Sequence, residues 1–295
     1  MITDLQDLGA FWDPNTRIIG IAFAPLGPQN GNPNLANSLG TLDVCAHEYT
    51  HGVTQFTAGL SVVGEPRSLN EGLSDIFGTS IERRILPNSW NWTLGEDAYT
   101  TRDMANPNNA FPPLTDPQPD RYHGLNWDFS GIQSPHHNNG VLIKWFHSIC
   151  TGQNPHANNI QAIDFDKAEQ IVFRAMKFYL QSSSGYYDMR EATIMAARDL
   201  YGTCSFEEVQ VTNAWAAANV GATFANVCGN NSPIAPGCYA LRAKHSNKYL
   251  QVVNNNDNTQ LVQNAANGNA NQIFRIDQPT NYDPTFPTYR LSNQV

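Results

Sequence analysis

DVCAHEYTH, residues 43–51, is the stretch of sequence from which the fold and the chemistry can be worked out. Apolar residues recur near helical spacing through this stretch, which predicts a helix over residues 43–56. His47 and His51 are four residues apart, so both imidazoles lie on one side of that helix and can bind one Zn²⁺. Glu48 lies beside His47, where it can take a proton from a zinc-bound water. The alternative is a surface helix whose histidines are solvated.

A second helix, predicted over residues 69–85, supplies two carboxylates on one face. Glu71 and Asp75 are four residues apart within SLNEGLSDIFG, residues 68–78. A hydrolytic zinc site needs a third protein ligand, and a second carboxylate can accept the other ring N–H of a ligand histidine. The alternatives are a capping box between Ser68 and Glu71 and a solvated acid at Asp75. The zinc-binding pattern twenty residues upstream favours the metal interpretation.

The string SPHHNNGV, residues 134–141, places His136 and His137 just before another predicted helix. Two loop histidines are more often an ordinary part of the surface. Peptide hydrolysis, however, gains from a donor that faces the developing oxyanion. Near a zinc site, one of these histidines is therefore a candidate for that donor.

Composition limits the class of protein. The 295 residues carry a formal charge of −9, which argues against a nucleic-acid partner. No apolar run approaches a membrane span, and the first residues have neither the basic nor the apolar region of a signal peptide. The 5 cysteines form no CxxC pair, and their odd number leaves at least one thiol free or intermolecular.

The order of the predicted elements indicates an α+β chain with a helical bundle. Residues 1–42 contain a strand-like run at 17–24, Asp43 is a candidate cap of the first helix, and residues 87–135 are expected to be mostly irregular. Four further helices follow, the last with a capping box of Ser205 and Glu208, over residues 139–150, 164–180, 187–201 and 205–218. A Pro/Gly/Asn linker at 229–236 separates the first domain, residues 1–228, from a β module over residues 237–295.

Together these motifs resemble the thermolysin-like zinc metallopeptidases. The similarity runs from about Gly9 to Gly221 and is carried most specifically by DVCAHEYTHGVTQFTAGL, SLNEGLSDIFGT, WTLGEDAY and HHNNGVLIKWF. The resemblance implies a mainly α-helical zinc-peptidase lobe preceded by a truncated β part. It also implies a secreted zinc endopeptidase that acts on peptides or proteins and prefers a bulky apolar residue after the cut.

The resemblance assigns roles residue by residue. It implies zinc ligands at His47, His51 and Glu71, a catalytic glutamate at Glu48 and a supporting carboxylate at Asp75. It further implies that His136 stabilises the tetrahedral intermediate. By the same resemblance, Arg102 holds a substrate carbonyl and Ala10 lies on the strand that pairs with the substrate backbone.

The same comparison implies a structural Ca²⁺ site at Asp43, Glu82 and Glu96. Asn91 and Thr93 occupy positions where the family usually has carboxylates, so a weakened single-ion site is expected.

The substrate side of the site departs from the family pattern. Val62 replaces a tyrosine that helps the oxyanion, and Gly9 replaces an asparagine that contacts substrate. Gly131 replaces an aspartate that orients the active-site histidine, a role for which Asp128 is a substitute. Most of the β-rich N-terminal lobe, one wall of the cleft, is expected to be missing.

The C-terminal segment resembles one repeat of a ricin-type β-trefoil lectin. The similarity is carried by SNKYLQV and by Gln272-Ile273-Phe274, which stands for the Gln-x-Trp of that fold. It implies carbohydrate as a partner, the alternative being a generic β segment. Two other functions therefore stay open: a catalytically impaired zinc-containing scaffold that works through this tail, and a carbohydrate-binding protein without metal.

Overall fold

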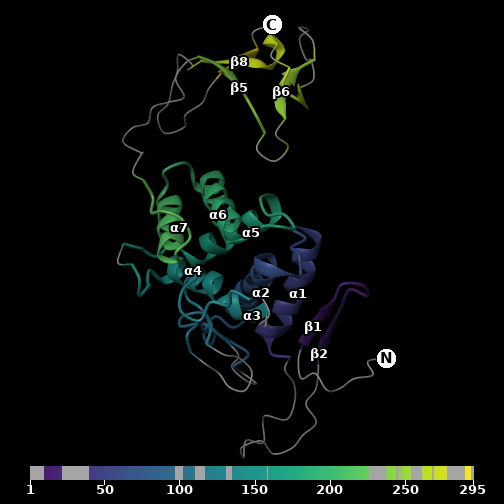
Figure 1. Ribbon diagram of the computed structural model, residues 1–295. Coiled ribbons are helices and arrows are strands. Elements are labelled where there is room, and N and C mark those ends of the chain that lie inside the picture. The colour runs from purple at the N-terminus through teal and green to yellow at the C-terminus, as the bar shows by residue number, and fades with distance from the viewer. Residues whose placement is uncertain are drawn as a thin grey trace, which may run out of the picture. The chain divides into compact units, whose positions relative to one another are not determined.

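The chain divides into two compact units, Met1–Ala225 and Asn226–Val295, which are described separately. The linker expected at 229–236, like Gly9 and Gly131, lies outside the described residues. The computed structural model describes residues 10–21, 40–96, 102–109, 117–130, 135–157, 159–225, 237–243, 246, 248–253, 261–267, 269–277 and 290–293 (Figure 1).

Two long helices that pack against each other form the centre of the first unit. Helix α1 spans Leu42–Phe56 and helix α2 spans Gly64–Ile85. They approach closely at Gly78, where an added Cβ would lie 2.7 Å from the carbonyl oxygen of Asp43. This close crossing brings the histidine face of α1 against the carboxylate face of α2.

The starts of these helices differ from the prediction. Thr41, not Asp43, is the N-cap of α1, and the Asp43 carboxylate in the first turn accepts from Val44 N at 2.8 Å. Helix α2 begins five residues before the predicted start at 69, so Ser68 is inside the helix and forms no capping box with Glu71. Pro66 explains the difference, because proline is tolerated in a first helical turn, where its missing N–H costs nothing.

The remaining helices form a bundle that packs against α2. They are α3 (Pro135–Asn138), α4 (Gly140–Thr151), α5 (Phe165–Phe178), α6 (Tyr186–Tyr201) and α7 (Phe206–Ala217). Their shared core includes Leu73 of α2 and the stacked rings of Trp145 and Trp215, whose centroids are 4.6 Å apart. The predicted box at α7 is only half formed, since Ser205 Oγ accepts from Glu208 N while the Glu208 carboxylate accepts from Cys204 N and Arg198.

Short strands complete the first unit. β1 (Ala10–Asp13) and β2 (Ile18–Ile21) form an antiparallel hairpin, and β3 (Thr93–Leu94) pairs with β4 (Arg102–Asp103). Trp12 fastens the hairpin to α1, because its Nε1 donates to Gln55 Oε1 at 2.8 Å and its ring lies over Gly52. The hairpin therefore lies beside the second half of α1, close to His51.

The second unit is built of short antiparallel strands, as expected for a small β module. A three-stranded sheet has the order β5-β8-β9, with β5 at Gly237–Ala240, β8 at Ile273–Asp277 and β9 at Arg290–Asn293. A separate hairpin joins β6 (Tyr249–Val252) to β7 (Leu261–Asn264), and a 3-10 turn spans Ala270–Gln272. The buried Gln272 amide ties these parts together, since its Nε2 donates to Gln251 Oε1 and to the carbonyl oxygen of Ala265.

Two chain-wide features follow from the described residues. Cys45, Cys150 and Cys238 are free thiols and Cys204 is in a disulfide, which confirms that an odd thiol remains. Within the described parts of the chain, no helix has both the length and the apolar character needed to cross a membrane.

Candidate metal centre

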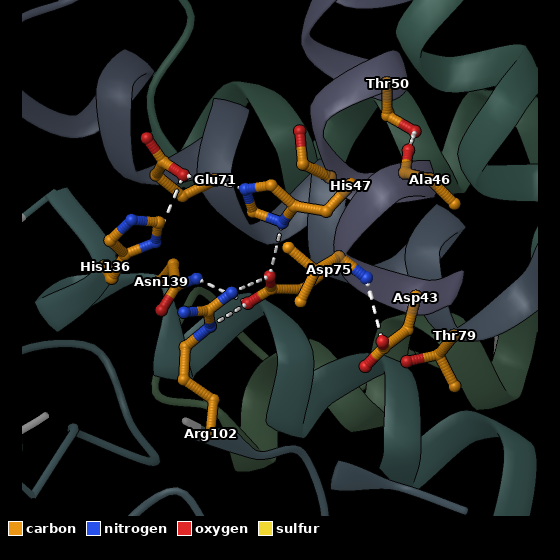
Figure 2. Close-up of polar contacts among 12 residues, drawn as sticks. Asp43, Ala46, His47, Thr50, Glu71, Asp75, Thr79, Arg102, His136 and Asn139 are labelled. Carbon is orange, nitrogen blue, oxygen red and sulfur yellow. Dashed lines mark hydrogen bonds and ion pairs between the residues drawn. The ribbon is translucent and has the colours of Figure 1, made fainter. Parts of the chain in front are cut away.

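The site begins with three side chains whose ligand atoms converge between α1 and α2. His47 Nε2 and His51 Nε2 are 3.1 Å apart, and Glu71 Oε2 lies 3.3 Å from the first and 3.4 Å from the second. Figure 2 shows the His47 ring directed towards Glu71. The two histidines and the glutamate predicted from the sequence are therefore brought together.

These three residues fit a metal ion. Glu71 Oε2 is buried and accepts no hydrogen bond within the described residues, although imidazole nitrogens surround it. A buried carboxylate oxygen without a hydrogen bond is unfavourable unless something else neutralises it. Nitrogen and carboxylate oxygen are the ligand atoms that Zn²⁺ takes in proteins, so a bound cation would satisfy them.

Neighbouring side chains hold the outer ring nitrogens of both histidines. His47 Nδ1 lies 2.7 Å from Asp75 Oδ1, and His51 Nδ1 lies 3.1 Å from both Asn70 Oδ1 and Ser74 Oγ. Hydrogen bonds at Nδ1 direct each Nε2 inward, as supporting residues of metal sites do. Asp75 is predicted from the sequence, whereas Asn70 and Ser74 are not. The available signal was their spacing, because Asn70 and Ser74 are one turn apart on the same helix, beside Glu71 and Asp75.

Asp75 is itself held from the other side. Arg102 donates to Asp75 twice, from Nε at 2.8 Å and from Nη2 at 2.6 Å, and Asn139 Nδ2 donates to Asp75 Oδ2 at 2.8 Å. Burial alone would raise the pKa of Asp75, but the charge of Arg102 and the contact with His47 hold it well below its usual range. In turn, burial works against protonation of His47, while Asp75 and Glu71 raise its pKa to about 9. In the described structure Arg102 is on Asp75 and not among the residues that line the cleft, so its contact with a substrate carbonyl stays a prediction.

The converging atoms open onto a cleft with a volume of about 710 Å³. Its lining includes Ala10 of β1, Glu48 of α1 and His136 of α3. Glu48 is largely buried, and this burial raises the pKa of its carboxyl. The edge of β1 away from β2 pairs with no other strand of the described chain, which leaves it free to receive an extended peptide.

His136 approaches the metal centre from the opposite side. Its Nδ1 lies 3.1 Å from Glu71 Oε2, and its burial lowers the pKa of the imidazole to about 4, against the opposing charge of Glu71 (Figure 2). The ring is therefore neutral near pH 7 and can act as an N–H donor.

The short helix α3 that carries His136 is held by residues that the sequence analysis missed. Gln118 Nε2 donates to the carbonyl oxygen of His136 and to Asn139 Oδ1, and the Tyr186 hydroxyl donates to the carbonyl oxygen of Asn138 at 2.7 Å. Asp128 contacts α3 through its backbone, since Asp128 N donates to Asn138 Oδ1 at 3.0 Å. No local sequence pattern marks Gln118 or Tyr186, because both reach α3 from distant segments.

Of the three carboxylates that the resemblance implies for calcium, Asp43 and Glu82 are buried and Glu96 is half-buried. Asn91 Nδ2 donates to Glu96 Oε1 at 2.7 Å, and Gly95 N donates to Asp43 Oδ2 at 2.5 Å. Burial raises the pKa of Glu96, and the negative charge of Asp43 adds to this. Within the described residues Asp43, Glu82 and Glu96 do not converge as closely as the ligand atoms of the metal centre do.

Known proteases are similar to this chain in sequence, and one is similar in fold. Residues 58–220 match the family described as thermolysin metallopeptidase, alpha-helical domain, and residues 223–295 match a ricin-type beta-trefoil lectin domain-like family. Neutral protease B of Bacillus subtilis (strain 168) is 35% identical over 188 residues, which cover 61% of this chain and 33% of that protein. Thermostable neutral protease NprT of Geobacillus stearothermophilus is 34% identical over 218 residues, which cover 72% of this chain and 37% of that protein.

A solved structure shares the fold. The precursor of protealysin, a metalloproteinase from Serratia proteamaculans, aligns with a TM-score of 0.58 and 24% identity over 72% of this chain and 65% of that one. The chain spans about a third of the length of the curated relatives described above.

Proposed function

Because this chain belongs to the thermolysin metallopeptidase family, we propose that it is a zinc-dependent endopeptidase. The observation that carries the proposal is the convergence of His47 Nε2, His51 Nε2 and Glu71 Oε2 within 3.4 Å of one another beside an open cleft. In this proposal these three residues hold the ion, and Asp75, Asn70 and Ser74 fix the orientation of the two histidines.

The ion would supply Lewis acidity, which polarises a peptide carbonyl and makes water more acidic. Glu48 takes a proton from the attacking water and delivers it to the departing amine, since it is the carboxylate of the cleft that lies next to the ligands without belonging to the proposed set. His136 donates a hydrogen bond to the oxyanion that develops on the carbonyl. The free edge of β1 at Ala10 aligns the substrate backbone, and Arg102 acts by holding Asp75 in place.

The test compares wild type with Glu48→Gln on a peptide or casein substrate, with and without a chelator. We expect cleavage by the wild type to stop on chelation and to fall by about 10²–10⁴-fold in the variant. Zinc content serves as the control, because Glu48 is not a proposed ligand and the variant should keep its ion. Equal cleavage by both proteins, or much less than one equivalent of zinc in the wild type, would contradict the proposal.

We further propose that the protein acts outside the cell. The disulfide at Cys204 supports this, since stable disulfides form in oxidising compartments. Detection of the protein in culture medium, against a cytosolic marker protein, tests it.

A single Ca²⁺ ion bound by Asp43, Glu82 and Glu96 is also proposed. The burial of Asp43 and Glu82 and the effect of the Asp43 charge on Glu96 support it, because a hard cation stabilises neighbouring carboxylates. The donors from Asn91 and Gly95 already occupy two of the oxygens, so the site should be weak. Added Ca²⁺ should raise the melting temperature of wild type, and Glu82→Gln should remove most of that gain.

For the second unit we propose carbohydrate binding, on the strength of the lectin-like match over residues 223–295. A glycan array probed with the full chain tests it, and Glu48→Gln should bind as the wild type does. The alternative function, an inactive zinc-containing scaffold that works through this unit, is favoured by one observation: Val62 lines the cleft with an apolar side chain where the family has an oxyanion donor. Glycan binding and bound zinc without any cleavage would support that alternative.

A further inference from the structure

One charged side chain of the cleft has no part in the proposed chemistry. Arg67 is the only arginine or lysine among the described residues that line the cleft. It lies in the first part of α2, four residues before Glu71 and therefore on the same face, about 5–6 Å away between Cβ atoms. The arginine is thus one helical turn from Glu71 of the metal centre, in a cleft that Val62 also lines.

Arg67 has no partner in the part of the chain that the structure describes. No hydrogen bond, ion pair or ring contact of its guanidinium is found there. Glu71 is within reach of an i to i+4 pair, but its carboxylate faces the histidines instead. The other arginines near the end of the same helix behave differently, since Arg83 pairs with Asp166 and Arg84 with Glu169, each at 2.7 Å.

Helix stability does not account for this arginine. Arg67 is the fourth residue of α2, close to the helix N-terminus, where the unsatisfied N–H groups carry partial positive charge. A cation at that end is unfavourable, whereas Arg83 and Arg84 lie in the last turn, where cations are favoured. The position of Arg67 is therefore better explained by something that it binds than by the helix that carries it.

The surroundings of Arg67 indicate the kind of group. Among the described residues that line the cleft, the carboxylates are Glu48 and Glu71, both committed to the metal centre in the proposed function. Much of the remaining wall is apolar, from Phe11, Trp12 and Leu60. A guanidinium beside an apolar wall attracts an anion more strongly than one in open water, and its planar fork matches a carboxylate.

We propose that Arg67 is a specificity-determining residue, which makes this cleft select peptides that carry an Asp or Glu side chain near the cleaved bond. The inference rests on the proposed function, because it takes the bound peptide to be a substrate. The binding of an acidic side chain by Arg67 does not itself depend on cleavage. The carboxylate that Arg67 binds is that of a side chain and not that of a chain terminus, because an endopeptidase cuts its substrates far from their termini.

The experiment uses the full chain and a set of quenched fluorescent peptides with acetylated and amidated ends. Members of the set differ by Glu or Gln at one position, for each position on both sides of the cleaved bond. We expect wild type to show a kcat/KM about tenfold higher for Glu than for Gln at one position. Arg67→Gln should lose this preference, and Arg67→Glu should prefer Lys at the same position. Adding a free C-terminal carboxylate to the Gln peptides tests the other source of the same chemistry, and we expect it to restore little.

A matched control and a binding measurement separate this inference from the proposed reaction. Arg84→Gln removes an arginine from the same helix outside the cleft and should keep the wild-type preference. In the Glu48→Gln background, fluorescence anisotropy of labelled peptides measures recognition without cleavage.

The outcomes are then distinct. Tighter binding of Glu peptides that depends on Arg67, in a protein that cleaves nothing, would uphold the inference and refute the peptidase. Three results would overturn the inference. They are cleavage and binding that do not differ between Glu and Gln peptides, a Glu preference that persists in Arg67→Gln, and no binding of either peptide.

Discussion

Asp75 Oδ1 lies 2.7 Å from His47 Nδ1, and this contact links the two helices of the metal centre. His47 is on α1 and Asp75 is on α2, so the orientation of the ligand histidine depends on how the helices pack. Since Nδ1 is engaged with the carboxylate, Nε2 is the nitrogen that faces Glu71. The position of the proposed ion is therefore set by tertiary structure as well as by the spacing on α1.

Replacing Asp75 should weaken metal binding and the fold together. We expect Asp75→Ala to lower zinc affinity by about 10–100-fold, because His47 loses the partner that orients it. The variant also leaves the buried Arg102 without its carboxylate, which should cost about 3–5 kcal/mol of unfolding free energy. Chelator competition measures the first effect and urea unfolding of the apoprotein the second. Unchanged zinc affinity in Asp75→Ala would show that the contact does not orient the ligand.

Replacing Glu71 should have a different outcome. Glu71→Ala removes a proposed ligand, so we expect the purified protein to retain no stoichiometric zinc, as measured by atomic absorption. The apoprotein should stay folded, because Glu71 Oε2 accepts no hydrogen bond within the described residues. Glu169→Ala, which removes an acid of α5 that pairs with Arg84 at the end of α2, serves as the control and should keep its zinc. Full zinc occupancy in Glu71→Ala would mean that another residue is the third ligand.

Local spacing was enough to predict the proposed ligands. His47 and His51 share a helical face, as do Glu71 and Asp75, and both relations follow from the helix period alone. The family resemblance selected His136 from the two adjacent histidines and added Arg102 and Ala10, and the structure brings His136 and Ala10 to the cleft. These residues could be found because each lies in a recognisable motif.

Other contacts could not be read from the sequence, because they join segments far apart in the chain. Asn139 reaches Asp75 across 64 positions, and Gln118 reaches Asn139 across 21. The early start of α2 was missed for a local reason, since Gly64 and Pro66 are turn residues as well as residues of a first helical turn. Arg67 could not be identified from the sequence, because only the structure shows that its guanidinium has no partner among the described residues.

The close crossing of α1 and α2 predicts the effect of a single methyl group. Gly78→Ala would place a Cβ 2.7 Å from the carbonyl oxygen of Asp43, a backbone atom that cannot rotate away. The helices must then separate, which we expect to cost about 1–3 kcal/mol of unfolding free energy. Zinc affinity should fall as well, because His47 and Asp75 move apart with their helices. Gly52→Ala is the matched control and should be milder, since the atoms nearest the added Cβ there belong to the Trp12 side chain, at 3.0 Å, and not to the backbone. Equal stability of Gly78→Ala and wild type would contradict the crossing.

His147 predicts how stability depends on pH, away from the metal centre. The residue is buried on α4, where its ring meets Trp92 edge-on at 4.9 Å between centroids. Burial, together with the charge of Lys144, lowers the pKa of His147 to about 4, although Asp103 acts in the opposite direction. In the unfolded chain the pKa of histidine is about 6.5, so between these values the unfolded state binds the extra proton.

The stability contributed by neutral His147 is therefore complete above about pH 6.5 and is lost as the pH falls towards 4, up to about 3 kcal/mol in all. Urea unfolding of the apoprotein at several pH values in this window measures the loss. His147→Gln cannot titrate, so its unfolding free energy should fall less steeply with decreasing pH than that of wild type. His156→Gln, which removes an imidazole whose Nε2 lies 2.7 Å from Asp120 Oδ2, serves as the control for the loss of a histidine elsewhere in the fold. Parallel profiles for wild type and His147→Gln would show that His147 has the same pKa in the folded and the unfolded chain, and the lowered pKa of the buried imidazole would then be wrong.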